Sequence, residues 1–191
     1  MTLSSADQFV TRTRLSFVWN YEKDEEWLND LSAQGQHLEE PGTFRYCFKK
    51  DAAVRYVYRL DYQQIKDQDQ LDAYYALFED MGWKHVGSNK GWHYYRKPYV
   101  EGETSPQIYT DRSSLTQMLR RIQMMLVLLA AVNFPIMTVN IMNVWSWYDK
   151  SVTVRGFISS VVVLQALVVI VLLYGFVRFQ RKIRKIDEGL S

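Results

Sequence analysis

Hydrophobic and polar residues alternate in several short segments of the N-terminal half, and this spacing predicts β-strands. Residues 14–20 alternate three large apolar side chains with polar ones, which predicts a strand with one buried face. Two longer aromatic-rich segments, residues 43–62 and 83–98, are each interrupted by a short polar turn. Strand, turn and strand in this order predict two antiparallel hairpins.

Two helices are predicted between these strands. Acidic residues 24–26 precede an apolar pattern that Gly35 ends, and a second apolar pattern over residues 69–81 ends at Gly82. Helix, glycine and aromatic hairpin therefore occur twice, 47 to 48 positions apart. We expect an α+β domain, ferredoxin-like or a related antiparallel sheet with helices on one face.

The C-terminal half has a different pattern. Residues 122–148 and 156–177 contain no Asp, Glu, Lys or Arg. About 20 helical residues cross a hydrocarbon core roughly 30 Å thick, so both runs are long enough to span a membrane. The short connection between them predicts an antiparallel transmembrane hairpin.

These patterns divide the chain into consecutive parts. We expect an α+β domain, a linker rich in Gly, Pro, Ser and Thr, a first transmembrane helix, an external loop, a second transmembrane helix and a basic tail. Their predicted bounds are 1–98, 99–114, 115–148, 149–155, 156–178 and 179–191.

Charge supports this division and predicts the orientation. Residues 1–100 carry a net charge of −2 and residues 101–191 one of +4, with the bases gathered at the ends of the apolar runs. Three arginines precede the first run and five bases follow the second, whereas the loop has only Lys150 and Arg155. Because positive charge collects on the cytoplasmic side, both termini are expected in the cytosol of a multi-pass protein of the cytoplasmic membrane.

Several residues in and beside the spans have expected roles. Asn133, Asn140 and Gln165 are predicted to hydrogen-bond between transmembrane helices, with a polar path through the membrane as the alternative. Trp145, Trp147 and Tyr148 are expected to anchor the first span at the interface. The basic tail is expected along the anionic inner leaflet through Arg178, Arg181, Lys182, Arg184 and Lys185.

The sequence offers little for catalysis. Cys47 is the only cysteine, and the three histidines lack acidic or thiol partners at metal-ligand spacing. No phosphate-binding loop or hydrolase motif occurs. We therefore expect no catalytic residue, metal or cofactor, and no nucleic-acid partner, because the basic excess comes from the membrane flanks.

One face of the predicted sheet is basic and partly aromatic. If helices cover only the other face, this one is either a solvated surface or a docking face for an acidic ligand or a protein partner. Its candidate residues are Arg45, Arg55, Arg59, His93 and Tyr95.

The segments NYEKDEEWLNDLSAQGQHLEE, FRYCF, YVYRLDY and FEDMGWKHVGSNKGWHYYRKP together resemble a bacterial family called domain of unknown function 2812 (DUF2812). The resemblance covers residues from about 14 to 121. Genes of this family often lie beside those of PadR-type transcriptional regulators. The resemblance thus implies a regulated envelope or stress-response component, and it supplies no catalytic residue.

The leading hypothesis is a non-enzymatic, membrane-anchored regulator or sensor whose α+β domain binds a ligand or partner. Its expected partners are the lipid bilayer and either another protein or a second copy, through the transmembrane helices. An accessory subunit of a membrane transporter is one alternative. An enzyme acting on a membrane-bound substrate is another, with Asp61, Arg59 and His93 as its candidate groups.

Overall fold

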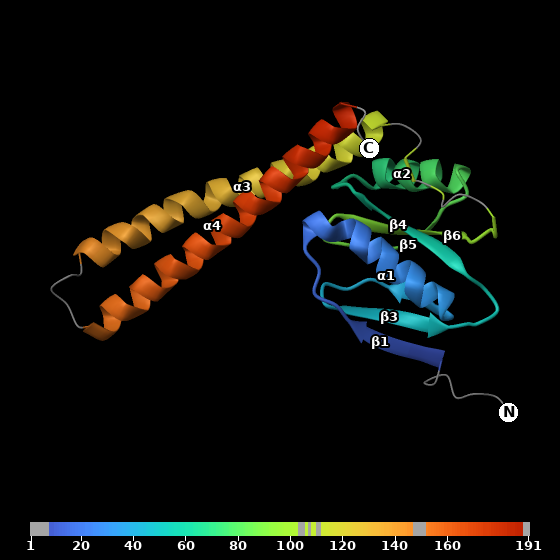
Figure 1. The fold of residues 1–191 in the computed structure, drawn as a ribbon, viewed down its shortest axis with the longest axis horizontal. Coiled ribbons are helices and arrows are strands. Elements are labelled where there is room, and N and C mark those ends of the chain that lie inside the picture. Colours follow the sequence, from blue (N-terminus) through green and yellow to red (C-terminus); the bar gives the residue numbers. More distant parts are fainter. Residues whose placement is uncertain (1–7, 103–105, 107, 110–111, 147–151, 189–191) are drawn as a thin grey trace. The chain divides into compact units, whose positions relative to one another are not determined.

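The computed structural model describes residues 8–102, 106, 108–109, 112–146 and 152–188, and Figure 1 shows their fold. The chain divides into two compact units, residues 1–114 and 115–191. The elements in order are β1 (Phe9–Thr13), a 3₁₀ turn η2 (Val18–Asn20), α1 (Tyr21–Ala33), β2 (Gln36–Glu40), β3 (Arg45–Lys50), β4 (Tyr56–Tyr62), α2 (Gln68–Asp80), β5 (Lys84–Asn89), β6 (Trp92–Pro98), α3 (Arg112–Ser146) and α4 (Val152–Asp187).

The first unit is built from two copies of a strand–helix–strand–strand motif. Each copy forms its own antiparallel sheet, with the strand orders β1–β3–β2 and β4–β6–β5. The helices begin at Tyr21 and Gln68, 47 positions apart, and glycines with positive φ follow both at Gly35 and Gly82. The predicted repeat is therefore present, but two sheets replace the expected single one. The hairpin expected over residues 43–62 was wrong, because β3 and β4 lie in different sheets, whereas β5 and β6 form the one expected over residues 83–98.

Sheet β4–β6–β5 is covered on both faces, which is why one sheet with helices on one side was the wrong expectation. In β4 every residue after Tyr56 is buried. Tyr58 and Leu60 enter a core with α1 and the other sheet, whereas Val57 enters a core with Phe78 of α2. Figure 1 shows α1 between the two sheets and α2 on the opposite side of β4.

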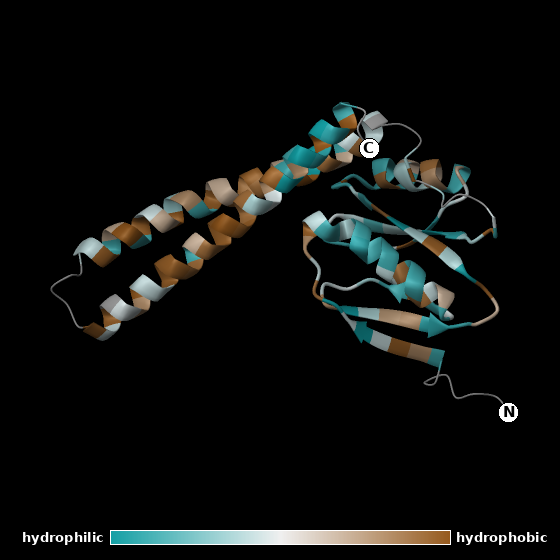
Figure 2. Cartoon of the chain, in the orientation of Figure 1, coloured by the Kyte–Doolittle hydropathy of each residue, from teal (hydrophilic) through white to brown (hydrophobic). Residues whose placement is uncertain are grey.

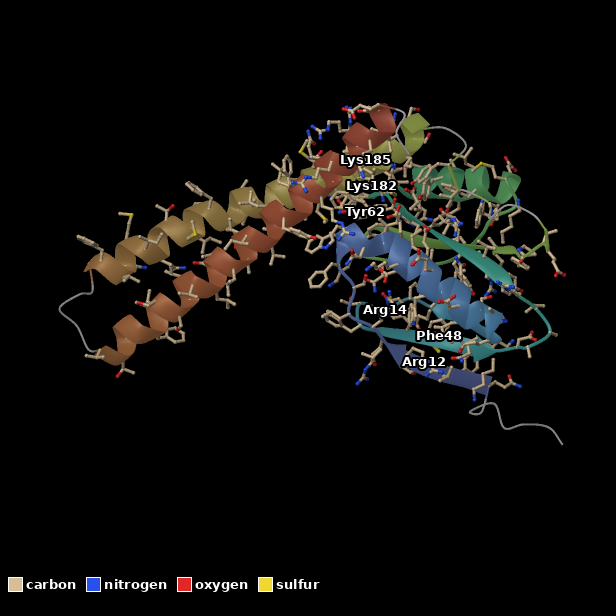
Figure 3. All side chains as sticks on the ribbon, viewed as in Figure 1. Arg12, Arg14, Phe48, Tyr62, Lys182 and Lys185 are labelled. Atoms are coloured by element: carbon tan, nitrogen blue, oxygen red, sulfur yellow. The ribbon has the colours of Figure 1, made fainter. Side chains whose placement is uncertain are left out.

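The first core joins the two motifs. Leu28 of α1, Leu38 of β2 and Phe48 of β3 are almost fully buried and cluster with Tyr58 and Leu60 of β4. Phe48, labelled in Figure 3, meets the indole of Trp27 edge-to-face with ring centres 5.6 Å apart. The apolar face of α1 thus packs on both sheets at once.

The first strand lies earlier in the chain than expected. It covers Phe9–Thr13, whereas Leu15 and Phe17 are 69% and 46% exposed. The alternating segment instead connects β1 to α1, because Arg14 binds the Asp24 carboxylate at 2.7 Å and the Ser16 hydroxyl bonds the same carboxylate. These bonds to the start of α1 turn the chain away from the sheet.

The second unit consists of two helices that are each long and apolar enough to cross a membrane. Hydrophobic residues dominate α3 and most of α4, and α4 becomes hydrophilic towards its carboxyl end (Figure 2). Pro135 lies within α3. The segment predicted as a basic tail continues α4 as a helix to Asp187.

Candidate functional site

The residues of the predicted docking face do not share one open surface. Arg45 and Arg55 are exposed, but Arg59, His93 and Tyr95 are 7%, 5% and 0% exposed. His93 and Tyr95 are not exposed as expected, because aromatic side chains of α2 pack on their rings. Arg59 is not exposed either, and it pairs with Glu25 of α1. Arg55 instead stacks its guanidinium 3.9 Å from the ring centre of Tyr99.

A buried polar cluster lies beneath α2, and Asp61 on β4 is its centre. The Asp61 side chain is 2% exposed, and both carboxylate oxygens accept hydroxyl protons. Tyr74 of α2 donates to Oδ2, and Tyr109 donates to Oδ1. Burial and the Asp61 charge raise the pKa of Tyr74 far above its ordinary value, so its hydroxyl stays protonated and can donate.

Tyr109 belongs to the segment predicted as a linker. Its neighbour Ile108 is 4% exposed and packs in the core with Val57, Phe78 and Trp83. These residues therefore dock on the α+β domain, only a few positions before α3 begins at Arg112. The polar cluster is thus joined by a short stretch of chain to the first apolar helix.

His93 on β6 lies directly across the strand pair from Asp61. Its Nε2 is 3.0 Å from the carbonyl oxygen of Gln63, so Nε2 carries the proton and Nδ1 accepts. The Ser88 hydroxyl, 2.7 Å away, donates to Nδ1. His85 Nε2 lies 2.9 Å from the same hydroxyl, so Ser88 hydrogen-bonds both histidines.

Burial keeps both histidines neutral. It is the largest cause that lowers the pKa of His93, and it lowers the pKa of His85 to about 4 together with repulsion from His93. Tyr75 of α2 stacks on the His85 ring at 4.1 Å between ring centres. The histidines therefore act as uncharged links between α2, β5 and β6.

Arg59 is held on the other side of the cluster. Its Nη1 donates to the carbonyl oxygen of Tyr58 at 2.7 Å, and its Nε lies 3.8 Å from Glu25 of α1. Glu25 also accepts the backbone N–H of Leu60 at 2.9 Å. The positive charge is thus compensated within the domain by a carboxylate that α1 places there.

This arrangement has defined chemical possibilities. A serine hydroxyl bonded to a neutral histidine is the start of a nucleophile-and-base pair, and Ser88 is exposed. However, the other ring nitrogen of His93, Nε2, donates to the uncharged backbone carbonyl of Gln63 and not to a carboxylate. Among the described residues no group of three or more His, Cys, Asp or Glu side chains could hold a metal ion.

In the second unit, Asn140 of α3 donates to Gln165 Oε1 of α4 at 2.9 Å, so these two predicted packing residues meet. Asn133 instead donates to the carbonyl oxygen of Leu129 in its own helix at 2.9 Å. Trp145 is 86% exposed, whereas Trp147 and Tyr148 lie outside the described residues.

The five basic residues predicted at the inner leaflet all lie in the last turns of α4. Of these, Arg184 pairs with Glu188 one turn further along the helix, at 3.6 Å. The helix therefore carries these charges at its carboxyl end, where a positive charge is favoured by the helix dipole.

Fold and site together define a class of protein: a duplicated α+β domain joined to a pair of apolar helices. The family model described as protein of unknown function DUF2812 matches residues 20–131, and the chain belongs to this family. No curated protein matches the chain, and no solved structure does. The matched region contains the whole polar cluster and the first part of α3.

Sequence reasoning missed several residues that build this site. Tyr74 lies within the apolar pattern of residues 69–81, Tyr109 within the predicted linker 99–114, and Ser88 within the predicted turn of residues 83–98. Their hydroxyls find partners only in the folded domain. The one signal available in the sequence is a tyrosine just before a predicted membrane helix. Its role in the cluster can be recognised only when the fold places it beside a buried carboxylate.

Proposed function

We propose that the chain is a membrane-anchored, non-enzymatic regulatory protein. The α+β domain binds a ligand or a partner protein, and the pair of apolar helices holds it at the membrane. The family resemblance supports a role in a PadR-linked envelope response. The distribution of Lys and Arg supports a cytoplasmic-membrane location with both termini in the cytosol.

The observation that carries this proposal is the docking of Ile108 and Tyr109. Tyr109 shares the Asp61 carboxylate with Tyr74 of α2, so α2 and the approach to α3 bind the same buried group. A ligand that shifts α2 therefore changes the hydrogen bonds of Asp61, one of which holds the segment that leads to α3. Signalling between a domain and a helix requires an element that has two states and that contacts both of them.

The enzyme alternative has less support from the same geometry. Asp61 is engaged by two tyrosines, Arg59 by Glu25, and His93 by Ser88 and Gln63. Each candidate group thus already contacts other groups of the domain. If changing Asp61, Arg59 and His93 singly to alanine leaves the physiological phenotype intact while the protein stays folded, the enzyme alternative is removed.

Native mass spectrometry of the protein, extracted gently from its own membranes, tests the proposal. A small molecule or soluble partner retained by the wild-type chain and lost from Tyr109→Phe supports a regulator that works through this segment. The exposed residue Asp30 provides a control, since Asp30→Ala should retain it. A co-purifying membrane transporter would favour the accessory-subunit alternative. Retention by Tyr109→Phe equal to that of the wild type would contradict the proposed route.

A further inference from the structure

A groove of about 720 Å³ opens between α3 and α4 within the second unit. The residues that line it form an apolar part and a basic part. Met124 and Val127 of α3 face Phe176 and Val177 of α4 and form an apolar part. Arg120 of α3 with Arg181 and Arg184 of α4 forms a basic part.

The groove lies at the ends of the two charge-free runs. Arg120 precedes the run 122–148, and Arg181 follows the run 156–177, so the change from apolar to basic lining falls at the same level on both helices. Gln123 donates to Gln180 Oε1 at 2.6 Å and ties the helices together there. In a bilayer, the hydrocarbon core gives way to the headgroup layer over a similarly short distance.

We propose that this groove binds one anionic phospholipid. The phosphate lies between Arg120 and Arg181, whose guanidinium groups donate in pairs to phosphate oxygens. One acyl chain lies along Met124, Val127 and Phe176. A basic pocket between apolar helices on the cytoplasmic side has the chemistry to hold a lipid headgroup.

Two acidic residues define which headgroup fits. Asp187 also lines the groove, and Glu188 pairs with Arg184 at 3.6 Å. These carboxylates offset part of the basic charge, so a polyanionic headgroup meets repulsion. The three lining arginines and these two carboxylates together leave one net positive charge, which matches a lipid with a single negative charge such as phosphatidylglycerol.

This inference rests on the membrane anchoring in the proposed function, but it does not involve the ligand of the α+β domain. The full-length protein is reconstituted in nanodiscs of equal phosphatidylglycerol and phosphatidylcholine, released into mild detergent, and examined by native mass spectrometry. The wild-type chain should retain one phosphatidylglycerol in preference to phosphatidylcholine.

Three variants make the test specific. Arg120→Gln with Arg181→Gln should reduce retention of phosphatidylglycerol roughly tenfold, because each base contributes a few-fold to binding. Arg178→Gln is the matched control, since this exposed arginine lies on the same helix outside the groove lining. Val127→Trp keeps every charge, fills the apolar part and should also reduce retention.

Other results overturn the proposal. An equal loss for Arg178→Gln means that general charge attraction, and not the groove, holds the lipid. Equal retention of phosphatidylcholine contradicts the proposed headgroup contact, and unchanged retention of phosphatidylglycerol by Val127→Trp contradicts the proposed acyl-chain site. A second copy of the chain in place of lipid assigns the groove to an oligomer interface. Failure of anchoring itself is recognised separately, because the wild-type chain would then leave the membrane in an alkaline wash.

Discussion

Asn29 of α1 accepts the backbone N–H of Tyr58 on β4 through its Oδ1, at 2.6 Å. Two neighbours on the same side of the helix repeat this contact. Glu25 accepts from Leu60 at 2.9 Å, and the Ser32 hydroxyl accepts from Tyr56 at 2.7 Å. Because alternate N–H groups of an edge strand point outward, one helix face satisfies the free edge of β4.

Replacing Asn29 should therefore expose this edge. In Asn29→Ala the Tyr58 amide loses its acceptor beneath a helix, which should cost about 1–3 kcal/mol in unfolding free energy. Hydrogen exchange at the amides of Tyr56, Tyr58 and Leu60 should become faster. Asn29→Asp keeps an acceptor and should change the exchange much less. Protection unchanged in Asn29→Ala would show that water or another group satisfies the strand.

The shared Asp61 carboxylate gives a second expectation. Tyr109→Phe removes the donor to Oδ1 and leaves a buried carboxylate oxygen without that partner, which should lower the unfolding free energy by about 1–3 kcal/mol. Thermal unfolding of the full chain in detergent measures this loss. Tyr99→Phe is a suitable control, because Tyr99 is exposed at 38% and its ring remains. Equal melting temperatures for Tyr109→Phe and the wild type would contradict the docking of this segment.

The neutral histidines make domain stability depend on pH. Burial lowers the pKa of His85 to about 4 and lowers that of His93, whereas unfolded histidines have a pKa near 6.5. Between these values the unfolded chain binds more protons than the folded one, so acid favours unfolding. Stability should be full above pH 6.5 and should fall as the pH decreases towards 4.

Thermal unfolding between pH 7.5 and pH 5 measures this dependence. His85→Gln combined with His93→Gln removes both titrating groups, so its melting temperature should depend less on pH than that of the wild type. The window above pH 5 limits the contribution of ordinary carboxylates. Identical pH profiles for the two proteins would show that these histidines do not set the acid sensitivity.

Much of the fold is visible in the sequence because its elements are local. The hairpin of β5 and β6, the two glycine-ended helices and their repeat follow from spacing within a few residues. The hairpin predicted over residues 43–62 was wrong, because β3 and β4 pair with strands of different sheets. The first strand was placed wrongly because alternation in residues 14–20 comes from exposed side chains. Such a pattern does not show whether a strand meets a neighbour, which depends on contacts distant in sequence.

The polar cluster was beyond sequence reasoning for a related reason. Arg59, Asp61 and His93 alternate on paired strands, which is equally typical of a solvated sheet face. Whether that face is open depends on where α2 packs, and nothing in the helix itself fixes this. The Asn140 and Gln165 pair was easier to predict, because two antiparallel helices in lipid offer few other partners.

The hydrogen bond between Asn140 and Gln165 should contribute modestly to the stability of the helix pair. Side-chain hydrogen bonds between membrane helices are worth about 0.6–2 kcal/mol. Asn140→Leu and Gln165→Leu should each weaken the pair, and a double-mutant cycle should show coupling of this size. Unfolding in increasing sodium dodecyl sulfate, followed by tryptophan fluorescence, gives the free energies. Asn133→Leu should have a smaller effect, since Asn133 bonds within its own helix; additive effects of the two main variants would contradict the bond.

The orientation of the two apolar helices is predicted from charge alone and needs its own test. Eight bases flank the outer ends of the charge-free runs, and only Lys150 and Arg155 lie between them. Moving those eight bases across a membrane is disfavoured relative to moving two, so the loop should be external. Reporter fusions after residues 100, 150 and 191 should read cytosolic, external and cytosolic. Any other order excludes this topology, and adding four lysines near residue 150 should weaken the preference if charge is its cause.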